Sequence, residues 1–346
     1  MIPCYLLLAA LSMPLPAATG QTPAAPAGEQ NDVVFTNYSP LSRSNELVRR
    51  LLSPLSAWRV NQTAMHPGHA LREQPLDLAH EKFAVHVPAS APPHGYALLV
   101  FVPPWPEATV PSAWAATLDR HGMIYVSAAN SGNDADVLDR RVPLALLAAW
   151  NIMQRYPVDP QRVYIGGFSG GSRVAERIAL GYPDLFHGAL LIAGSDPIGI
   201  AQMSLPPAGL FRQFQDATRL IYLTGQNDAA HLDMDSHSRQ SMRSWCVFHV
   251  DTVAVPWTGH ELPGPAPLSR ALDLLDNPVQ TDPDKLAHCR AGIDKNLNAQ
   301  LQKTENLLAG GERAAAETLL DKIDAHYGGL AAPRSSELLE KIIAKH

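Results

Sequence analysis

The sequence has little charge and no excess of basic residues. Charged residues make up 17% of its 346 residues, and 27 Lys and Arg residues are outnumbered by 33 Asp and Glu residues, for a formal net charge of −6. Without a positive field the chain has nothing to attract a phosphate backbone or an anionic lipid surface. We therefore expect no nucleic acid or membrane-surface partner. Apolar residues make up 46% of the chain, which excludes a protein that is disordered throughout.

The sequence also lacks an apolar run long enough to cross a membrane near its start. Residues 1–20 carry no charged side chain, and their apolar run at 5–11 is followed by Pro14 and Pro16. A spanning helix needs about 20 apolar residues. The pattern is typical of a secretory signal peptide cleaved near Gln21, although the usual basic residues at its start are missing. We expect a secreted or periplasmic protein with no membrane span after cleavage.

Three cysteines are too few for a disulfide-rich scaffold. Cys4 would leave with the signal peptide, so Cys246 and Cys289 remain as an even pair. In an oxidising compartment they could form a bridge between the main domain and the C-terminal segment. Two free buried thiols fit the spacing as well, because spacing does not establish geometry. No cluster of Cys and His has the spacing of a structural zinc site, and we expect no metal.

Short apolar runs alternate with helical patterns through the middle of the chain. The apolar runs lie at residues 82–88, 96–102, 123–128, 162–166, 189–193, 220–224 and 247–255. Helical patterns lie at 45–52, 112–121 and 143–156. Continuous apolar strands separated by helices are typical of a mostly parallel central sheet with helices on both faces. The sequence therefore predicts an α/β fold.

Composition divides the chain into four segments. After the signal peptide, a Pro/Ala-rich stretch has little to bury, and we expect a disordered linker over residues 21–44. The α/β domain is expected over residues 45–282. Charged residues then become more frequent, and Ala and Leu recur at helical spacing, which predicts a C-terminal helical extension over residues 283–346. This extension could pack on the main domain, form a wall over the active site or provide a homodimer surface.

Residues 167–171 read Gly-Phe-Ser-Gly-Gly, which is the G-x-S-x-G pattern of a nucleophile elbow. The pattern lies between an apolar run and a helical pattern, and its tight turn needs small residues on both sides of Ser169. The turn would expose the Ser169 hydroxyl and leave the Gly170 N–H free at the helix start, where it can bind an oxyanion. The alternative is a glycine-rich turn with a bystander serine. A phosphate loop is disfavoured, because no Lys-Ser or Lys-Thr pair follows the glycines.

A serine nucleophile needs a histidine base and a carboxylate, and after such an elbow the acid precedes the histidine in the chain. Asp228 follows the apolar run at 220–224, and His260 follows the run that ends at residue 255. Both would lie at the carboxyl ends of strands, where the sites of open α/β sheets are found. The sequence therefore predicts Ser169, Asp228 and His260 as a catalytic triad.

Other side chains compete for these roles. Asp196 also follows an apolar run and could replace Asp228 as the acid. A metal site around His231 has poor sequence context. Asp233 and Asp235 are expected to be solvated, and His231 and His237 are expected to be surface residues or substrate contacts rather than the base.

With these residues the chain resembles the α/β-hydrolase fold, and within it the secreted esterases related to polyhydroxybutyrate depolymerases and to feruloyl or acetylxylan esterases. The resemblance covers residues 81–275 and rests on the elbow and on three stretches. These are Lys-Phe-Ala-Val-His-Val-Pro at 82–88, Tyr-Pro-Val-Asp-Pro-Gln-Arg-Val-Tyr at 156–164 and Tyr-Pro-Asp-Leu-Phe at 182–186. The resemblance implies the same triad and an acyl transfer that requires no cofactor or metal ion.

The chain departs from this family after the apolar run at 96–102. Family members usually have His-Gly there, with a backbone amide just beyond it as the second oxyanion donor. This chain has Pro103 and Pro104, which have no N–H to donate. Trp105 is the first residue that can donate, so we expect its N–H as the second donor. The alternative is that Trp105 only lines the cleft.

Together these features predict a secreted serine hydrolase that cleaves carboxylic esters through an acyl-enzyme. The segment between Asp196 and Leu220 is too short for a large cap domain, which is compatible with bulky or polymeric esters. The alternatives are a serine peptidase or polyamide hydrolase with the same triad, and a non-catalytic binding protein on the same scaffold.

Overall fold

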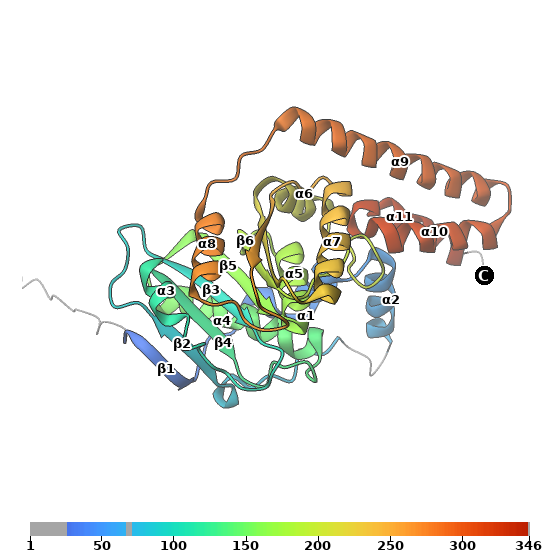
Figure 1. Cartoon of the computed structure of the whole chain (residues 1–346). Helices are drawn as coiled ribbons and strands as arrows, with labels where there is room; N and C mark the ends of the chain where they lie inside the picture. The colour runs from blue at the N-terminus through green and yellow to red at the C-terminus, as the bar shows by residue number, and fades with distance from the viewer. Residues whose placement is uncertain (1–25, 67–70, 345–346) are drawn as a thin grey trace, which may run out of the picture.

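The computed structural model describes residues 26–66 and 71–344, and an eight-stranded sheet lies at its centre (Figure 1). The strands are β1 (Gly28–Val33), β2 (Phe83–Val87), β3 (Tyr96–Val102), β4 (Met123–Ala128), β5 (Val158–Phe168), β6 (Gly188–Ile192), β7 (Arg219–Gly225) and β8 (Val250–Val255). Their order in the sheet is β1-β2-β4-β3-β5-β6-β7-β8. The pairs of β2 with β1 and with β4 are antiparallel, and all other neighbours are parallel. The predicted signal peptide lies outside the described residues.

The α/β class predicted from the sequence is confirmed, with a core on each face of the sheet. Strands β2, β3, β4 and β6 are buried at every position. Along β3, Leu98 and Val100 belong to one core and Leu99 and Phe101 to the other, because successive side chains of a strand point to opposite faces.

Eleven α-helices surround the sheet in the described part of the chain. They are α1 (Ser44–Leu51), α2 (Pro54–Met65), α3 (Ala115–Arg120), α4 (Val142–Arg155), α5 (Gly170–Gly181), α6 (Ala208–Ala217), α7 (Ala229–Ser244), α8 (Pro265–Asp276), α9 (Pro283–Ala309), α10 (Arg313–Tyr327) and α11 (Arg334–Ile343). The shorter turns are η1 (Pro40–Ser42), η2 (Leu78–His80), η3 (Val137–Arg141) and η4 (Gly328–Ala331). Buried side chains of α3 and α8 share one core, and those of α4 and α5 share the other.

The expectation of a disordered linker over residues 21–44 is wrong from Gly28 onward. Strand β1 pairs with β2 at the sheet edge, and Phe35 is fully buried with its ring centroid 4.6 Å from that of Phe83. The Tyr182 hydroxyl donates to the carbonyl oxygen of Leu41 (3.2 Å). Strand β1 could not be predicted from its sequence, which is Gly-Glu-Gln-Asn-Asp-Val. An edge strand is held by backbone pairing and needs no apolar pattern.

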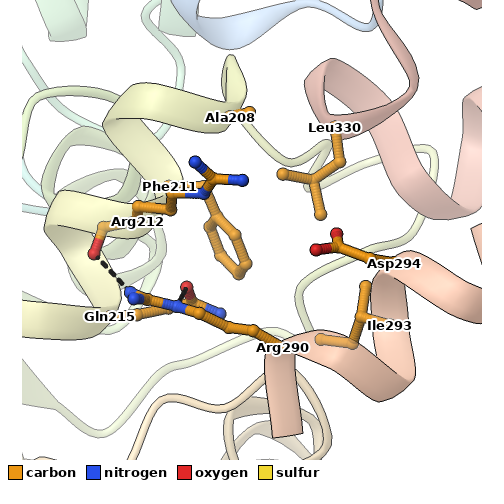
Figure 2. Close-up of a pocket in the computed structure, with 8 residues that line it drawn as sticks. All are labelled: Ala208, Phe211, Arg212, Gln215, Arg290, Ile293, Asp294 and Leu330. Carbon is orange, nitrogen blue, oxygen red and sulfur yellow. Dashed lines mark hydrogen bonds between the residues drawn. The ribbon is translucent and has the colours of Figure 1, made fainter. Parts of the chain in front are cut away.

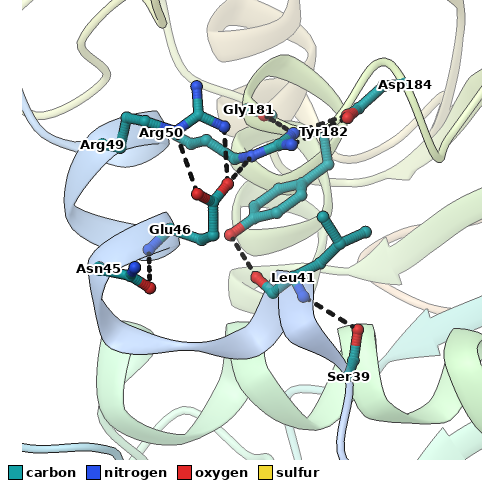
Figure 3. Close-up of polar contacts among 9 residues, drawn as sticks. All are labelled: Ser39, Leu41, Asn45, Glu46, Arg49, Arg50, Gly181, Tyr182 and Asp184. Carbon is teal, nitrogen blue, oxygen red and sulfur yellow. Dashed lines mark hydrogen bonds and ion pairs between the residues drawn. The ribbon is translucent and has the colours of Figure 1, made fainter.

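A buried arginine of α1 is hydrogen-bonded to the C-terminal end of α5 and to the residues that follow it, as Figure 3 shows. The Arg50 side chain is 5% exposed and donates to both carboxylate oxygens of Asp184 (2.6 and 2.8 Å) and to Glu46 (2.9 Å). Its guanidinium also lies 4.6 Å from the ring centroid of Tyr182. A buried charge is tolerated only when it is paired in this way. Helix α1 therefore packs on the main domain.

Helices α9, α10 and α11 form a C-terminal extension that packs on the main domain. Leu301, Ile323 and Leu339 belong to the same core as the strand residues. A disulfide between Cys246 and Cys289 joins the end of α7 to α9, which resolves the two possibilities left open by the spacing. Figure 1 shows α9 along one side of the molecule, and α10 and α11 beside α2.

The contact between α9 and α6 is polar as well as apolar (Figure 2). Arg290 donates to Gln215 Oε1 (2.7 Å), to Asp216 Oδ1 (2.8 Å) and to the carbonyl oxygen of Arg212 (2.9 Å). These bonds fix α9 next to the disulfide. Among the described helices, none is both long enough and apolar enough to cross a membrane.

Candidate active site

Ser169 lies in a sharp turn between β5 and α5. Its backbone has φ 54° and ψ −121°, a conformation that costs a non-glycine residue roughly 1–3 kcal/mol. The turn is so tight that a Cβ atom on Gly167 would overlap the carbonyl oxygen of Gly171. A Cβ atom on Gly171 would in turn overlap the carbonyl oxygen of Val102 in β3. Only glycine fits on either side, which explains the spacing of the G-x-S-x-G pattern.

The structure brings Ser169, His260 and Asp228 into one hydrogen-bonded series. The Ser169 hydroxyl lies 3.0 Å from His260 Nε2, and His260 Nδ1 lies 2.7 Å from Asp228 Oδ2. Because a carboxylate only accepts, the His260 ring must carry its proton on Nδ1 and offer the Nε2 lone pair to the serine. The arrangement has the geometry of a nucleophile, a base and an orienting acid.

Backbone bonds between two loops bring the acid and the histidine together. Strands β7 and β8 are parallel neighbours, so their carboxyl ends meet at one edge of the sheet. Past these ends, the N–H of Gln226 donates to the carbonyl oxygen of Val255 (3.0 Å), and that of Asn227 donates to Thr258 (2.9 Å). Asp228 follows directly on one loop and His260 on the other.

Asp228 is ionised although its side chain is buried. It is 8% exposed, and this burial alone would raise the pKa of its carboxyl group. Hydrogen bonds from His231 and His260 oppose that effect, and the pKa of Asp228 lies below its ordinary value. At neutral pH the group is therefore ionised and can accept both bonds.

Asp196, the competing acid, has other partners. Its Oδ1 lies 3.8 Å from Nε of Arg173, and its backbone N–H donates to Glu176 Oε2 (2.7 Å). Arg173 lies in the first turn of α5, so Asp196 forms an ion pair beside the elbow rather than a bond to His260.

The expectation that Asp235 is solvated is wrong. Asp235 is 3% exposed and accepts hydrogen bonds from the hydroxyls of Ser195 and Thr224 (2.6 Å each). Burial outweighs these bonds and raises the pKa of Asp235. The buried positions of α7 include Asp235, Ser238 and Met242, a helical spacing that places Asp235 on the inner face. Asp233 has a side chain that is 73% exposed, as expected.

Two loops meet over Gly170, the first residue of α5. Its N–H has no preceding helical carbonyl to bind and is free for an oxyanion. Trp105 lies in the loop after β3 with its ring centroid 6.0 Å from that of Phe168, and its N–H makes no hydrogen bond within the described residues. In the loop after β4, the Asn133 N–H donates to the carbonyl oxygen of Pro104 (3.0 Å). The Asn133 carboxamide lies so close to Gly170 that a Cβ atom there would overlap it.

Sequence reasoning missed the position of Asn133, because no motif surrounds it. It also missed the role of His231 in the arrangement. His231 Nδ1 donates to Asp228 Oδ1 (2.8 Å), and its ring stacks on that of His260 with centroids 4.2 Å apart and planes 19° apart. The signal available was the spacing Asp228-x-x-His231 at a helix start, which places the two side chains on one face.

In the described part of the chain, one group of three His, Cys, Asp or Glu residues has its possible metal-ligand atoms within 4.8 Å of one another. These residues are Asp228, His231 and His260. A metal ion binds an imidazole nitrogen in the plane of the ring. Because the two rings are stacked with their planes only 19° apart, no position within bonding distance of both rings lies in both ring planes. Both Nδ1 atoms already donate to the carboxylate. The cluster has the geometry of a hydrogen-bonded site and does not fit a metal site.

The comparisons with known proteins concern the fold. No family model and no curated protein matches the chain. Among solved structures, an esterase from Thermogutta terrifontis is 16% identical with a TM-score of 0.42, and the match covers 58% of this chain and 87% of that one. A ferulic acid esterase is 16% identical with a TM-score of 0.40, covering 56% and 88%. A puromycin-hydrolyzing peptidase from Mycobacterium tuberculosis is 18% identical with a TM-score of 0.40, covering 56% of this chain and 36% of that one.

These similar structures are esterases and a peptidase, and at such identities the likeness concerns the arrangement of the fold alone. The strand order, the parallel strands from β4 to β8 and the turn after β5 define the α/β-hydrolase fold. That fold, predicted from the sequence, is confirmed. The activity has to be argued from the site itself.

Proposed function

We propose that the chain is a serine hydrolase that cleaves carboxylic esters through an acyl-enzyme. The observation that carries this proposal is the series of hydrogen bonds from Ser169 through His260 to Asp228, at 3.0 and 2.7 Å. The strained backbone of Ser169 adds support. Such strain persists only where the surrounding structure enforces it, and strained residues cluster at active sites.

The proposed first step is acylation of Ser169. Its Oγ attacks the ester carbonyl carbon while its proton passes to His260 Nε2, and the charge that develops on the imidazole is offset by Asp228. Collapse of the tetrahedral intermediate breaks the bond to the alcohol oxygen, which takes the proton from His260. Water then repeats the sequence on the acyl-enzyme and releases the acid. These steps use no cofactor or metal ion.

The oxyanion is proposed to be bound by the N–H groups of Gly170 and Trp105. Gly170 stands at the positive end of α5, where a free N–H and the helix dipole both favour negative charge. Trp105 supplies the first N–H after Pro103 and Pro104. Loss of one such donor costs about 3 kcal/mol of transition-state stabilisation, so the loop after β3 controls the efficiency of the enzyme.

The substrate class proposed is a bulky or polymeric ester, in line with the resemblance to secreted depolymerase-like and feruloyl esterases. The support is the exposure around the base. The His260 side chain is 39% exposed, and Trp257, three residues earlier, is 89% exposed. Exposed aromatic surface on the loop that carries the base offers a contact for an apolar substrate. A secreted or periplasmic location is part of the same proposal.

The test is labelling of the purified protein with a fluorophosphonate, read by intact mass and peptide mapping. A single adduct on Ser169 is expected in the wild type. Ser169→Ala should give no adduct and no hydrolysis, with a melting temperature close to that of the wild type. Folded wild-type protein that takes no label would favour the binding-protein alternative. Turnover of amides in preference to matched esters would favour the peptidase alternative.

A further inference from the structure

The second oxygen of the proposed triad carboxylate is also occupied. Asp228 Oδ2 accepts from His260, and Asp228 Oδ1 accepts from Nδ1 of His231 at 2.8 Å. The same His231 ring stacks on the His260 ring, with centroids 4.2 Å apart. One side chain thus contacts both the acid and the base of the series, and the acylation mechanism above makes no use of it.

We propose that His231 is a positioning residue that holds Asp228 and His260 in the orientation that activates Ser169. This inference rests on the proposed serine hydrolase function. The geometry assigns the main action to the His231 N–H, which fixes the carboxylate plane. The stacked ring makes a smaller contribution by limiting the tilt of the His260 ring.

The need for such a residue follows from where the acid lies. Asp228 is the N-cap of α7, at the end of the loop that follows β7. The terminal torsion of an aspartate is broad and roughly two-fold, so one bond from His260 leaves the carboxylate plane poorly defined. A second donor on the other oxygen removes this freedom.

His231 is itself well placed to serve as a fixed donor. It lies in the first turn of α7, and that helix is anchored by the buried Asp235 one turn later. Its side chain is 21% exposed, against 62% for His237 farther along α7. On the His260 ring, Phe168 makes a further contact with ring centroids 4.8 Å apart. The base is therefore in contact with two aromatic rings as well as hydrogen-bonded.

The experiment measures the rate of fluorophosphonate labelling of Ser169, which needs no knowledge of the natural substrate. In this reaction the Ser169 Oγ–P bond forms, the P–F bond breaks, the serine proton passes to His260 and fluoride leaves. Three variants separate the two actions of the side chain. His231→Gln keeps an N–H donor without the ring, His231→Phe keeps a ring without the donor, and His231→Ala removes both.

We expect His231→Ala and His231→Phe to slow labelling about 10- to 100-fold, the range for loss of a hydrogen bond to a charged group. His231→Gln should stay within about threefold of the wild type, because its N–H can rescue the bond. His237→Gln is the matched control, since His237 lies on the same helix and pairs with Asp233 (3.4 Å), and its labelling rate should be unchanged. Melting temperatures show which variants are folded.

Labelling of folded His231→Ala within twofold of the wild type would overturn the inference. So would a normal rate in His231→Phe with a slow one in His231→Gln, because the ring and not the donor would then be the feature that matters. A spectroscopic check is the downfield proton resonance of His260 Nδ1–H, which should shift in His231→Ala and not in His237→Gln.

Failure of the inference and failure of the proposed function give different results. If the wild type labels on Ser169 and every folded His231 variant labels equally fast, the hydrolase proposal stands and the role of His231 is refuted. If the folded wild type does not label, the hydrolase proposal and the role of His231 fall together.

Discussion

Among single residues, the two candidate acids differ by their partners. Asp228 accepts from His260, whereas Asp196 forms an ion pair with Arg173. Both follow apolar strands in the sequence, so their local patterns are equivalent. The two acids differ in which of their loops lies next to the loop of His260. Backbone hydrogen bonds between the loops after β7 and β8 place Asp228, and not Asp196, beside His260.

We therefore predict that Asp228→Asn lowers the hydrolysis rate about 10³- to 10⁴-fold, because an amide at this position favours the wrong tautomer of His260. Asp196→Asn should change the rate by less than about threefold. The measurement is turnover of a short-chain aryl ester, with circular dichroism to verify folding. The assignment of the acid is wrong if Asp196→Asn proves to be the damaging change.

Among the secondary-structure elements, α7 connects the candidate site to the C-terminal extension. Asp228 precedes its first turn, and Cys246 follows its last turn and is joined to Cys289 of α9. A helix of 16 residues is about 24 Å long, so the disulfide and the site lie at opposite ends. The bridge should therefore affect stability and leave the chemistry alone.

The replacement of both cysteines, Cys246→Ser with Cys289→Ser, tests this separation. The bridge spans a sequence separation of 43 residues, for which loop entropy predicts a loss of about 4 kcal/mol of unfolding free energy. Denaturant unfolding measures the loss, and the labelling rate of Ser169 should stay within twofold of the wild type. A reductant should destabilise the wild type and have no effect on the double variant. Slower labelling of the folded double variant would show that α9 supports the site.

The same scale explains which elements could be predicted. Strands β3 and β4 have the predicted bounds, because strands buried along their whole length appear in the sequence as nearly continuous apolar runs. Helix α2 was missed, since Leu55 is its only buried side chain and no apolar stripe marks it. Strand β1 was missed because its pairing uses the backbone. Elements at the edge of the core carry the weakest patterns.

For the molecule as a whole, a buried group of acids behind the elbow makes stability depend on pH. Glu176 of α5 is fully buried and bonded to the Asp196 N–H and to the Ser238 hydroxyl of α7. Burial raises the pKa of Glu176 to about 8, against the opposing effect of these bonds. The folded state thus keeps a proton that the unfolded chain, with an ordinary value of 4.5, releases.

The sign of the effect follows from this difference. Below the unfolded value both states are protonated and the stabilisation is fully present, and it is lost as the pH rises toward about 8. Relative to Glu176→Gln, the wild type should lose on the order of 1.4 kcal/mol of unfolding free energy per pH unit in that window. Denaturant unfolding of both proteins at several pH values measures the difference. Parallel pH profiles would mean that Glu176 is ionised in the folded protein.

Local patterns were sufficient for the α/β class, for the elbow around Ser169, and for the positions of Asp228 and His260 after their strands. Strand and helix periodicity and tight turns depend on neighbours in the chain, so they can be recognised without coordinates. The catalytic roles of these three residues remain a prediction. Their chain order follows from the order in which the strands end at one edge of the sheet.

Long-range pairing settled what the chain order left open. Four features join segments that no local pattern relates. They are the choice of Asp228 over Asp196 as the partner of His260, the stacking of the His231 ring on the His260 ring, the bonds of Asp235 to Ser195 and Thr224, and the bridge between Cys246 and Cys289. Each depends on which loops and helix faces meet when the sheet is assembled. A hydrogen bond or a disulfide forms between atoms that are close in space, and closeness across the chain exists only in the folded molecule.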